Sequence, residues 1–353
     1  MHFYCIFRIL RPILQSLHYK IPESNIISSF FLQNPCMNHK NSIPLQCTTT
    51  IVHHNNNKIK EYKPLKISGI MIKIENISFA YPRKRTNVHT NLTLDLEQNK
   101  IYGLLGKNGT GKSTLLYLIA GLLKPSEGTI TMETTDEETG ETTVHSTFDR
   151  HQEVLRETFF VNEEYTLPPI TLNEWSSSLG GFYPSYSEEL FRQCLSDFDI
   201  KGNPKLTTLS MGQQKKVIIS FALASGVKYL FMDEPTNGLD IPSKAQFRKV
   251  VSSCMTEERT IIISTHQVHD VEFLLDHIII IDNDRLLLNA STGEITDRFV
   301  FEYRTPGSPT EGVIYQEPTL QGNATMAYRK STDPETNINL ELLFNATVKG
   351  LFI

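Results

Sequence analysis

The chain has 353 residues, of which 39% are hydrophobic, and this suffices for one large globular domain or two modest ones. A net charge of -5 gives no support to a nucleic-acid partner. The five cysteines show neither paired metal-ligand spacing nor a disulfide framework, which suits a reducing compartment. No apolar run approaches the roughly 20 residues of a membrane-spanning helix, so work at a membrane would require another chain to supply the membrane part.

Residues 1–70 differ in character from the rest. They carry eight lysines and arginines against two glutamates, and the stretch "HHNNNK" (53–58) is polar and aperiodic. Arg8 and Arg11 interrupt the apolar start, which disfavours a secretory signal. We predict a disordered extension here, or sequence that lies upstream of a natural start at Met71.

From Met71 the pattern is that of an α/β domain. The stretches "MIKIENISFAY" (71–81) and "LTLDLEQNKIYGLLG" (92–106) predict strands, and residues 134–147, rich in Thr and Glu, predict a surface hairpin or loop insert. Residues 165–208 are predicted to be largely helical. The sequence has no internal repeat, so any nucleotide cassette occurs once.

The stretch "GLLGKNGTGKST" (103–114) predicts a nucleotide site. It fits the pattern G-x-x-x-x-G-K-[ST] between an apolar strand and the helical "TLLYLIAGLL", and its candidate contacts are Gly106, Lys107, Asn108, Gly109, Thr110, Gly111, Lys112, Ser113 and Thr114. Glycines let the backbone turn closely around phosphate, and the following helix adds its positive end. We expect Lys112 to reach the β- and γ-phosphates of ATP, and Ser113 to ligate Mg²⁺. Many unrelated nucleotide enzymes use this loop.

Three later stretches narrow the choice. "LSMGQQKKVIISFALAS" (209–225) places Ser210 and Gly212 at a helix start, where anions are favoured, although Ser is also an ordinary N-cap. "YLFMDEPTNGLD" (229–240) predicts a strand that ends at Asp233 and Glu234, which is where α/β sheets carry their ligands. Asp233 suits the Mg²⁺ shell, and Glu234 could act as general base towards water. "TIIISTHQVHD" (260–270) predicts a buried strand that leads to His266, which could hydrogen-bond the γ-phosphate.

In order and spacing, these stretches resemble the ATP-binding subunit of an ABC transporter from about Met71 to Val300. The matching motifs are the P-loop (Gly106–Thr114), the signature (Leu209–Gln213), the strand with the catalytic glutamate (Tyr229–Glu234), the D-loop (Gly238–Asp240) and the switch histidine His266. The resemblance implies nucleotide contacts from Ser210, Gly212, Gln213 and Asp240. It also implies that Tyr81 stacks on adenine, the alternative being an aromatic residue packed on the sheet.

The sequence departs from the family pattern at two positions. Met211 stands where the signature commonly has glycine, and Glu163 falls where the family has a glutamine. A carboxylate can also ligate Mg²⁺, so Glu163 is a candidate metal ligand with Ser113 and Asp233.

The resemblance implies an α/β fold: a P-loop NTPase core of the ABC type with a mixed β-sheet over residues 71–300, a helical subdomain at about 164–208, and a small α+β tail over 301–353. In the tail, "GVIYQE" and "TMAYRK" predict strands and "NINLELLFNATV" predicts a helix. Trp175, Phe182 and Tyr183 are candidates for a groove that receives a permease helix, and core packing is an equal alternative.

The implied function is ATP hydrolysis by a subunit that pairs with a second copy of itself or with a homologous ATPase subunit. The pair would drive an integral-membrane permease from the cytoplasmic face of the membrane, and the cassette resembles exporter-type subunits. One alternative is a soluble ABC-type ATPase with a regulatory or remodelling role. Another is a module that binds ATP without turnover, and the presence of both Glu234 and His266 argues against it.

Overall fold

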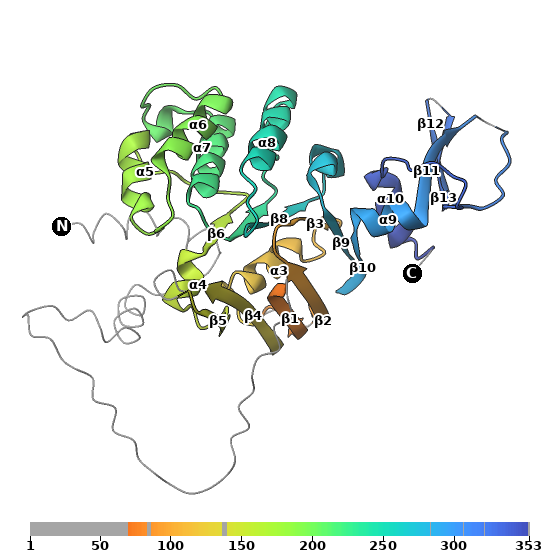
Figure 1. Ribbon diagram of the computed structural model, residues 1–353, viewed down its shortest axis with the longest axis horizontal. Helices are drawn as coiled ribbons and strands as arrows, with labels where there is room; N and C mark the ends of the chain where they lie inside the picture. Colours follow the sequence, from red (N-terminus) through yellow and green to blue (C-terminus); the bar gives the residue numbers. More distant parts are fainter. Residues whose placement is uncertain are drawn as a thin grey trace, which may run out of the picture. The chain divides into compact units, whose positions relative to one another are not determined.

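The computed structural model describes residues 70–351 except 83–85, 136–139, 283, 306 and 321 (Figure 1). The extension predicted over residues 1–70 therefore lies outside the described residues, apart from Ile70. Ile70 begins the first strand, one residue before the predicted Met71.

An antiparallel sheet opens the described chain. Its strand order is β2-β1-β4-β5, and the strands are β1 (Ile70–Phe79), β2 (His89–Glu97), β4 (Glu127–Thr135) and β5 (Thr142–Ser146). Along β2, Leu92, Leu94 and Leu96 are buried while their neighbours are exposed, because successive side chains of a strand point to opposite faces. Strands β4 and β5 form a hairpin, in agreement with the prediction for residues 134–147.

A second sheet, here called the central sheet, has the order β10-β9-β3-β8-β7-β6. Its strands are β3 (Ile101–Leu105), β6 (Thr158–Val161), β7 (Tyr229–Asp233), β8 (Thr260–Thr265), β9 (His277–Asp282) and β10 (Arg285–Ser291). The strands from β9 to β6 run parallel, whereas β10 is antiparallel to β9. The sheet is mixed, as predicted, and the carboxyl ends of β3, β6, β7 and β8 meet at one edge.

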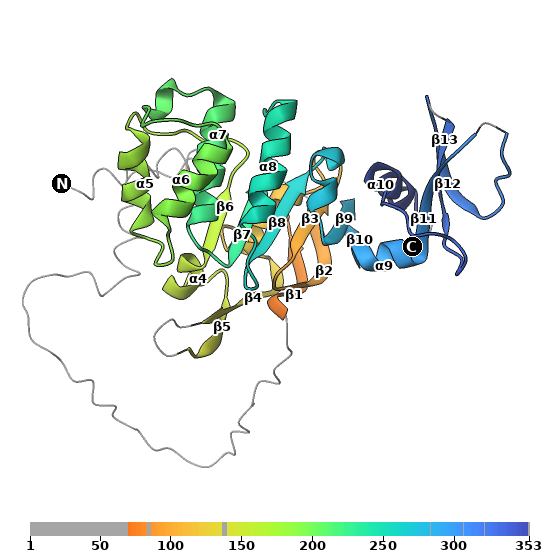
Figure 2. The same ribbon diagram turned by 45° about the horizontal axis from the view of Figure 1, so that its top comes forward.

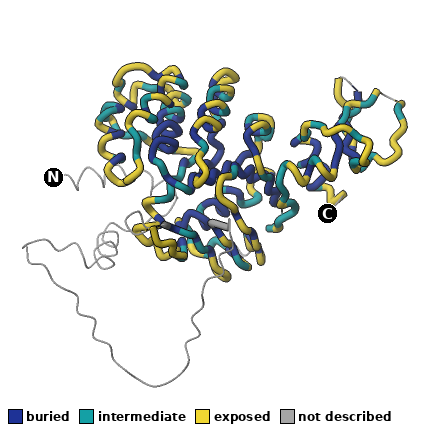
Figure 3. Tube along the Cα trace, viewed as in Figure 1, coloured by how far each residue is buried: buried dark blue, intermediate teal, exposed yellow. Residues whose placement is uncertain are grey.

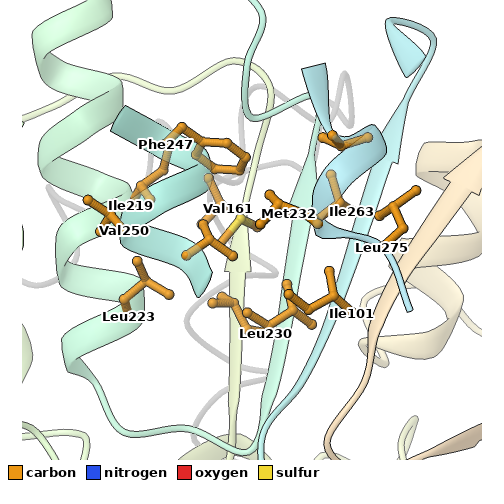
Figure 4. Close-up of a cluster of buried hydrophobic side chains, with 14 of the residues drawn as sticks. Ile101, Val161, Ile219, Leu223, Leu230, Met232, Phe247, Val250, Ile263 and Leu275 are labelled. Atoms are coloured by element: carbon orange, nitrogen blue, oxygen red, sulfur yellow. The ribbon is translucent and has the colours of Figure 1, made fainter. Parts of the chain in front are cut away.

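Both faces of the central sheet are covered, so every residue of β3, β7 and β8 is buried and the middle of each strand is apolar. Tyr102 and Leu104 of β3 pack with the antiparallel sheet and α3 (Lys112–Ile119). Ile101 and Leu105 face the other side, towards the helices α5 (Leu172–Gly180), α6 (Glu188–Asp197), α7 (Met211–Ala224) and α8 (Ile241–Ser253). Figures 1 and 2 show these layers, Figure 3 shows the buried chain along the central strands, and Figure 4 shows the helix-side core.

Helices α5 and α6, here called the helical subdomain, lie between the short α4 (Gln152–Arg156) with β6 and the short helix η2 (Leu206–Thr208). They fall within residues 164–208, for which the sequence predicts a helical subdomain. Trp175 and Tyr183 pack on the ring of Phe221 in α7, and Trp175 is buried, so both serve the core. Phe182 is the one of the three candidate groove aromatics that is exposed.

The helical subdomain also meets α8 through a pair of cysteines. The sulfurs of Cys194 in α6 and Cys254 at the end of α8 lie 3.7 Å apart as free, buried thiols.

The chain ends in a small α+β unit. After α9 (Thr292–Arg298), the strands β11 (Phe299–Arg304), β12 (Val313–Thr319) and β13 (Gly322–Tyr328) form an antiparallel sheet of order β11-β13-β12, and α10 (Leu340–Val348) follows. The sequence predicted β12, β13 and α10 but neither α9 nor β11. Helix α10 contacts the short helices η3 (Val268–Asp270) and η4 (Glu272–Leu274): the Leu340 N–H donates to Glu272, and His269 meets Glu341.

Across the described ranges, none of the helices has the length and apolar character that crossing a bilayer demands.

Candidate active site

The loop between β3 and α3 is built around the side chain of Lys112. Lys112 is 6% exposed, and its ammonium donates to the carbonyl oxygens of Gly106 at 2.8 Å and Lys107 at 3.2 Å. Burial lowers the pKa of this ammonium, and the carboxylates of Glu234, Asp233 and Glu163 oppose that change. The loop therefore holds a desolvated cation at the carboxyl end of β3, which is the arrangement that an anionic ligand requires.

Glycine is needed at the two ends of this loop. A Cβ on Gly106 would lie 2.6 Å from Thr110 Oγ1 and 2.7 Å from the Ile281 oxygen. Gly111 has a φ of +97°, and a Cβ there would lie 2.5 Å from Val88 and 2.9 Å from His89. The backbone is thus packed from beneath, while Lys107, Asn108 and Gly109 at the tip are exposed.

Asp233 ends β7 as a buried carboxylate, 2% exposed. Burial raises its pKa, whereas hydrogen bonds from the hydroxyls of Ser264 and Ser113 oppose the rise. Asp233 and Ser113 thus lie together, next to Lys112. Hydroxyl and carboxylate oxygens are ligands that Mg²⁺ prefers, so this pair could hold the ion together with phosphate oxygens.

Glu234 follows as a second buried acid, with three donors on its carboxylate. Oε1 accepts from the backbone N–H of His266 at 3.1 Å and lies 2.7 Å from the Nδ1 of that histidine, and Oε2 accepts from the Thr265 hydroxyl at 3.1 Å. Lys112 Nζ lies 3.9 Å from Oε1. Because Nδ1 of His266 is engaged, Nε2 is the ring atom that can reach a ligand.

The backbone of Glu234 is also unusual. Its φ of +45° lies in the left-handed region, which side chains other than glycine rarely adopt. Its N–H donates to the Ser264 oxygen at 3.0 Å, which joins the residue to β8.

The predicted signature residues lie at the exposed start of α7. Ser210 and Gln213 form a reciprocal capping box, since each side chain accepts from the backbone N–H of the other. A Cβ on Gly212 would lie 3.4 Å from the Gly238 oxygen, so this turn faces the D-loop. Among the described residues, the hydrogen bonds of Ser210 and Gln213 stay within the cap and do not reach the P-loop.

Asp240 likewise acts as a helix cap. Its carboxylate accepts from the Ser243 N–H at 2.9 Å at the start of α8. The hydrogen bond from the Ser243 side chain, followed by this one from the Ser243 backbone, lowers the pKa of Asp240.

The structure places Tyr81 and Glu163 beside the site, each with a protein partner. The hydroxyl of Tyr81 lies 3.0 Å from Thr114 Oγ1, and its ring meets Phe79 edge-on at 5.0 Å. Glu163 follows β6, is exposed, and accepts from the Asn237 side chain at 2.9 Å.

Sequence reasoning missed two buried groups. His89 in β2 donates through Nε2 to the Gly111 oxygen at 3.0 Å, and burial lowers its pKa. Lys215 in α7 lies behind the turn that follows Glu234. No local motif marks either residue, because each acts on a segment distant in the sequence.

Comparisons with known proteins agree with this geometry. The family model described as ABC transporter matches residues 89–237. The ABC transporter ATP-binding protein NatA of Bacillus subtilis is 30% identical over 224 residues, which cover 62% of this chain and 88% of NatA. The lipoprotein-releasing system ATP-binding protein LolD of Leptospira interrogans is 33% identical over 186 residues, which cover 52% of this chain and 76% of LolD.

Among solved structures, a dimeric ATP-binding cassette in a post-hydrolysis state, bound to ADP and Pi, matches with a TM-score of 0.52 and 24% identity. The match covers 63% of this chain and 98% of that one, and at this identity it shows the fold alone. The P-loop, the two acids after β7 and the histidine after β8 lie at one edge of the central sheet. This chain also aligns with most of the length of NatA and of LolD. This chain therefore belongs to the ABC transporter family, as an ATP-binding subunit with an ABC-type ATPase domain.

Proposed function

We propose that this subunit hydrolyses ATP as one half of a pair and that the pair drives a separate integral-membrane permease from the cytoplasmic face of the membrane. The observation that carries the proposal is the meeting of Lys112, Asp233, Glu234 and His266 at one sheet edge, with Glu234 Oε1 2.7 Å from His266 Nδ1 and 3.9 Å from Lys112 Nζ. A cation, a metal-binding acid, a base and a hydrogen-bonding imidazole are the groups that phosphoryl transfer to water needs.

Binding begins with Lys112. We propose that its ammonium exchanges the carbonyl oxygens of Gly106 and Lys107 for the β- and γ-phosphates, a stronger partnership because the phosphates are charged. Ser113 and Asp233 would hold Mg²⁺, which when bound offsets phosphate charge; Glu163 remains a further candidate ligand. Tyr81, hydrogen-bonded to Thr114, would present its ring to the adenine.

Hydrolysis follows at Glu234. Its carboxylate accepts a proton from water as the water oxygen attacks the γ-phosphorus and the bond to ADP breaks. The His266 and Thr265 donors fix the orientation of the carboxylate. His266 Nε2 would donate to the γ-phosphate. Release of that phosphate would therefore remove a hydrogen bond from the same histidine whose Nδ1 orients Glu234.

Pairing would complete the site. Ser210, Gly212 and Gln213 lie at a helix start, and helix starts favour anions. Met211 of the signature and Ile241, which follows Asp240, are 83% and 84% exposed, so both apolar side chains are available to a partner subunit. We propose that the signature and Asp240 of one subunit face the ATP on the P-loop of the other. The solved cassette with the same fold is itself a dimer, which supports pairing but says nothing of which motifs face each other.

A transport role is supported by two relatives, which are ATP-binding proteins of an ABC transporter and of a lipoprotein-releasing system. Export is the direction that we propose, on the resemblance of the cassette to exporter-type subunits. Phe182, exposed on the helical subdomain, is a candidate contact for the permease.

The test is Glu234→Gln, which keeps the shape of the side chain and removes its basicity. Turnover should fall by about 10²–10⁴-fold, the usual worth of general-base catalysis, while ATP binding survives. Uncleaved ATP should then hold two subunits together, so the variant should elute as a dimer with ATP and as a monomer with ADP.

Adding Ser210→Arg to Glu234→Gln serves as the control, because bulk at the signature should abolish the ATP-dependent dimer. A Glu234→Gln protein that stays monomeric at saturating ATP would contradict the pairing. A multi-span membrane protein encoded beside this chain, which raises its ATPase rate when the two are reconstituted, would support transport. The remodelling alternative predicts no such stimulation.

A further inference from the structure

A buried lysine of the signature helix is left without a role by the mechanism above. Lys215 lies in the second turn of α7 and is 5% exposed. Burial lowers the pKa of its ammonium, and the carboxylates of Glu163, Glu234 and Asp233 oppose that shift. A buried ammonium is tolerated only where it is paired and hydrogen-bonded, so its partners indicate what it does.

Both hydrogen-bond partners of the ammonium belong to the turn that carries the catalytic acid. Nζ donates to the backbone carbonyl oxygen of Glu234 at 3.2 Å and to the backbone carbonyl oxygen of Asn237 at 3.1 Å. The Asn237 N–H donates to the same Glu234 oxygen at 3.2 Å. Lys215 therefore bridges the two ends of the turn, and it does so from the helix that starts at the signature.

The turn requires such support because Glu234 has a φ of +45°. A left-handed non-glycine residue persists only where its surroundings over-determine it. The amide on one side of Glu234 is fixed by β8 through Ser264. The carbonyl on the other side is held by a charged donor, and charged donors make the stronger hydrogen bonds. The direction of the Glu234 side chain follows from these two fixed peptide groups.

The side chain of Asn237 extends this hydrogen-bond network towards the segment after β6. The side chain of Asn237 donates to Glu163 at 2.9 Å, so the carboxylate at the position of the expected glutamine is joined to the same turn. Tyr165 donates to the Met211 oxygen at 2.9 Å, and its ring lies 5.9 Å from Lys215 Nζ. The signature helix, the turn after β7 and the segment after β6 thus meet around one ammonium.

We propose that Lys215 is a positioning residue for ATP hydrolysis: it holds the left-handed backbone of Glu234 from the signature helix and so aims the carboxylate at the attacking water. The inference rests on the proposed role of Glu234 as general base. It adds that the start of α7 and the base are mechanically connected within one subunit, so a partner that engages the signature also acts on the base.

The first test compares two neighbouring lysines. Lys215→Met keeps the length of the side chain but removes the donor, and we expect kcat to fall at least about tenfold, since small misplacements of a reacting group are costly. The KM for ATP should stay within about twofold, because Lys112 and Ser113 are untouched. Lys216→Met is the control: the Lys216 ammonium donates to Phe198 and Gln246, away from Glu234, and kcat should not change.

Rescue distinguishes positioning from packing. Lys215→Arg restores a charged donor and should recover most of the lost kcat, although its shape fits the pocket less well. If Lys215→Met proves unfolded by thermal denaturation, Lys215→Gln, which keeps a neutral donor, carries the same expectation of reduced kcat at unchanged KM. Loss of ATP affinity in parallel with kcat, without rescue by arginine, would overturn the proposal in favour of a structural role.

A double variant separates this inference from the proposed function. Once Glu234→Gln has removed the base, adding Lys215→Met should reduce turnover by less than about twofold more, because the lysine acts through Glu234. Losses that multiply, or a Lys215→Met enzyme with wild-type kcat, would overturn the role of Lys215 alone. Wild-type turnover in Glu234→Gln would instead overturn the proposed base and leave Lys215 nothing to position.

Discussion

At the scale of single residues, two P-loop glycines differ in what surrounds them. Gly111 and Gly109 both have positive φ, +97° and +85°. A Cβ on Gly111 would collide with Val88 and His89 beneath the loop, whereas a Cβ on Gly109 would meet nothing within 4 Å. The same chemical change therefore probes the close packing at one position and only the backbone conformation at the other.

Gly111→Ala should therefore cost more than Gly109→Ala. Each carries the left-handed penalty of about 1–2 kcal/mol, and Gly111→Ala adds overlap that must shift β2 or the loop. We expect a larger fall in melting temperature and a larger loss of ATP affinity for Gly111→Ala. Equal effects in thermal unfolding and nucleotide titration would show that His89 does not support the loop.

At the scale of elements, α10 is joined to the segment just after His266. His269 in η3 lies between Glu272 of η4 and Glu341 of α10, at 3.5 and 2.9 Å. Burial alone would lower the pKa of His269, but hydrogen bonds to Glu341 and Glu272 outweigh it and the pKa is raised above 6.5. The stabilisation is thus complete below pH 6.5 and is lost as pH rises through the folded-state pKa.

The expected consequence is a pH-dependent cost of His269→Gln. The variant should melt below the wild type at pH 6, by about 1–3 °C given the small worth of exposed ion pairs. The gap should close by pH 8.5. His277→Gln offers a control of opposite sign, since burial lowers the pKa of His277 and its protonation disfavours the fold. A gap for His269→Gln that is independent of pH would contradict this reading.

The elements also show how far the sequence could be read. The P-loop, the acids after β7 and the histidine after β8 were predictable because each motif is contiguous and the parallel sheet brings the strand ends together. The roles of Lys215 and His89 could not be predicted, because their partners are distant in the chain. Glu234 lies 19 residues from Lys215, and Gly111 lies 22 residues from His89. Strand β11 was missed because its apolar start continues directly from α9, without a turn signal between them.

At the scale of the whole molecule, the proposed function needs two subunits. The signature cap and Asp240 make their hydrogen bonds within α7 and α8, so nothing in one described subunit brings them to its own P-loop. A site completed in trans makes activity depend on association, which follows mass action.

ATPase turnover per subunit should accordingly fall on dilution. We expect the specific rate to decrease as protein concentration drops below the dissociation constant of the ATP-bound pair, and to recover on concentration. A steady-state assay over a hundredfold dilution series, with sizing chromatography alongside, measures both. A rate per subunit that stays constant, with monomers alone at every concentration, would argue for a site complete in one chain.

The contact between Cys194 and Cys254 makes it possible to detect movement of the helical subdomain relative to α8. With sulfurs 3.7 Å apart on α6 and α8, any motion of the helical subdomain must either carry α8 along or pull the thiols apart. Both thiols are buried, so an alkylating reagent can reach them only when this contact opens. The hydrogen bond from Cys194 favours the thiolate of Cys254, because it lowers the pKa of that thiol against the opposing effect of burial. The rate at which an alkylating reagent labels these thiols, measured with and without nucleotide, would thus show whether nucleotide moves the helical subdomain relative to α8, without any introduced probe.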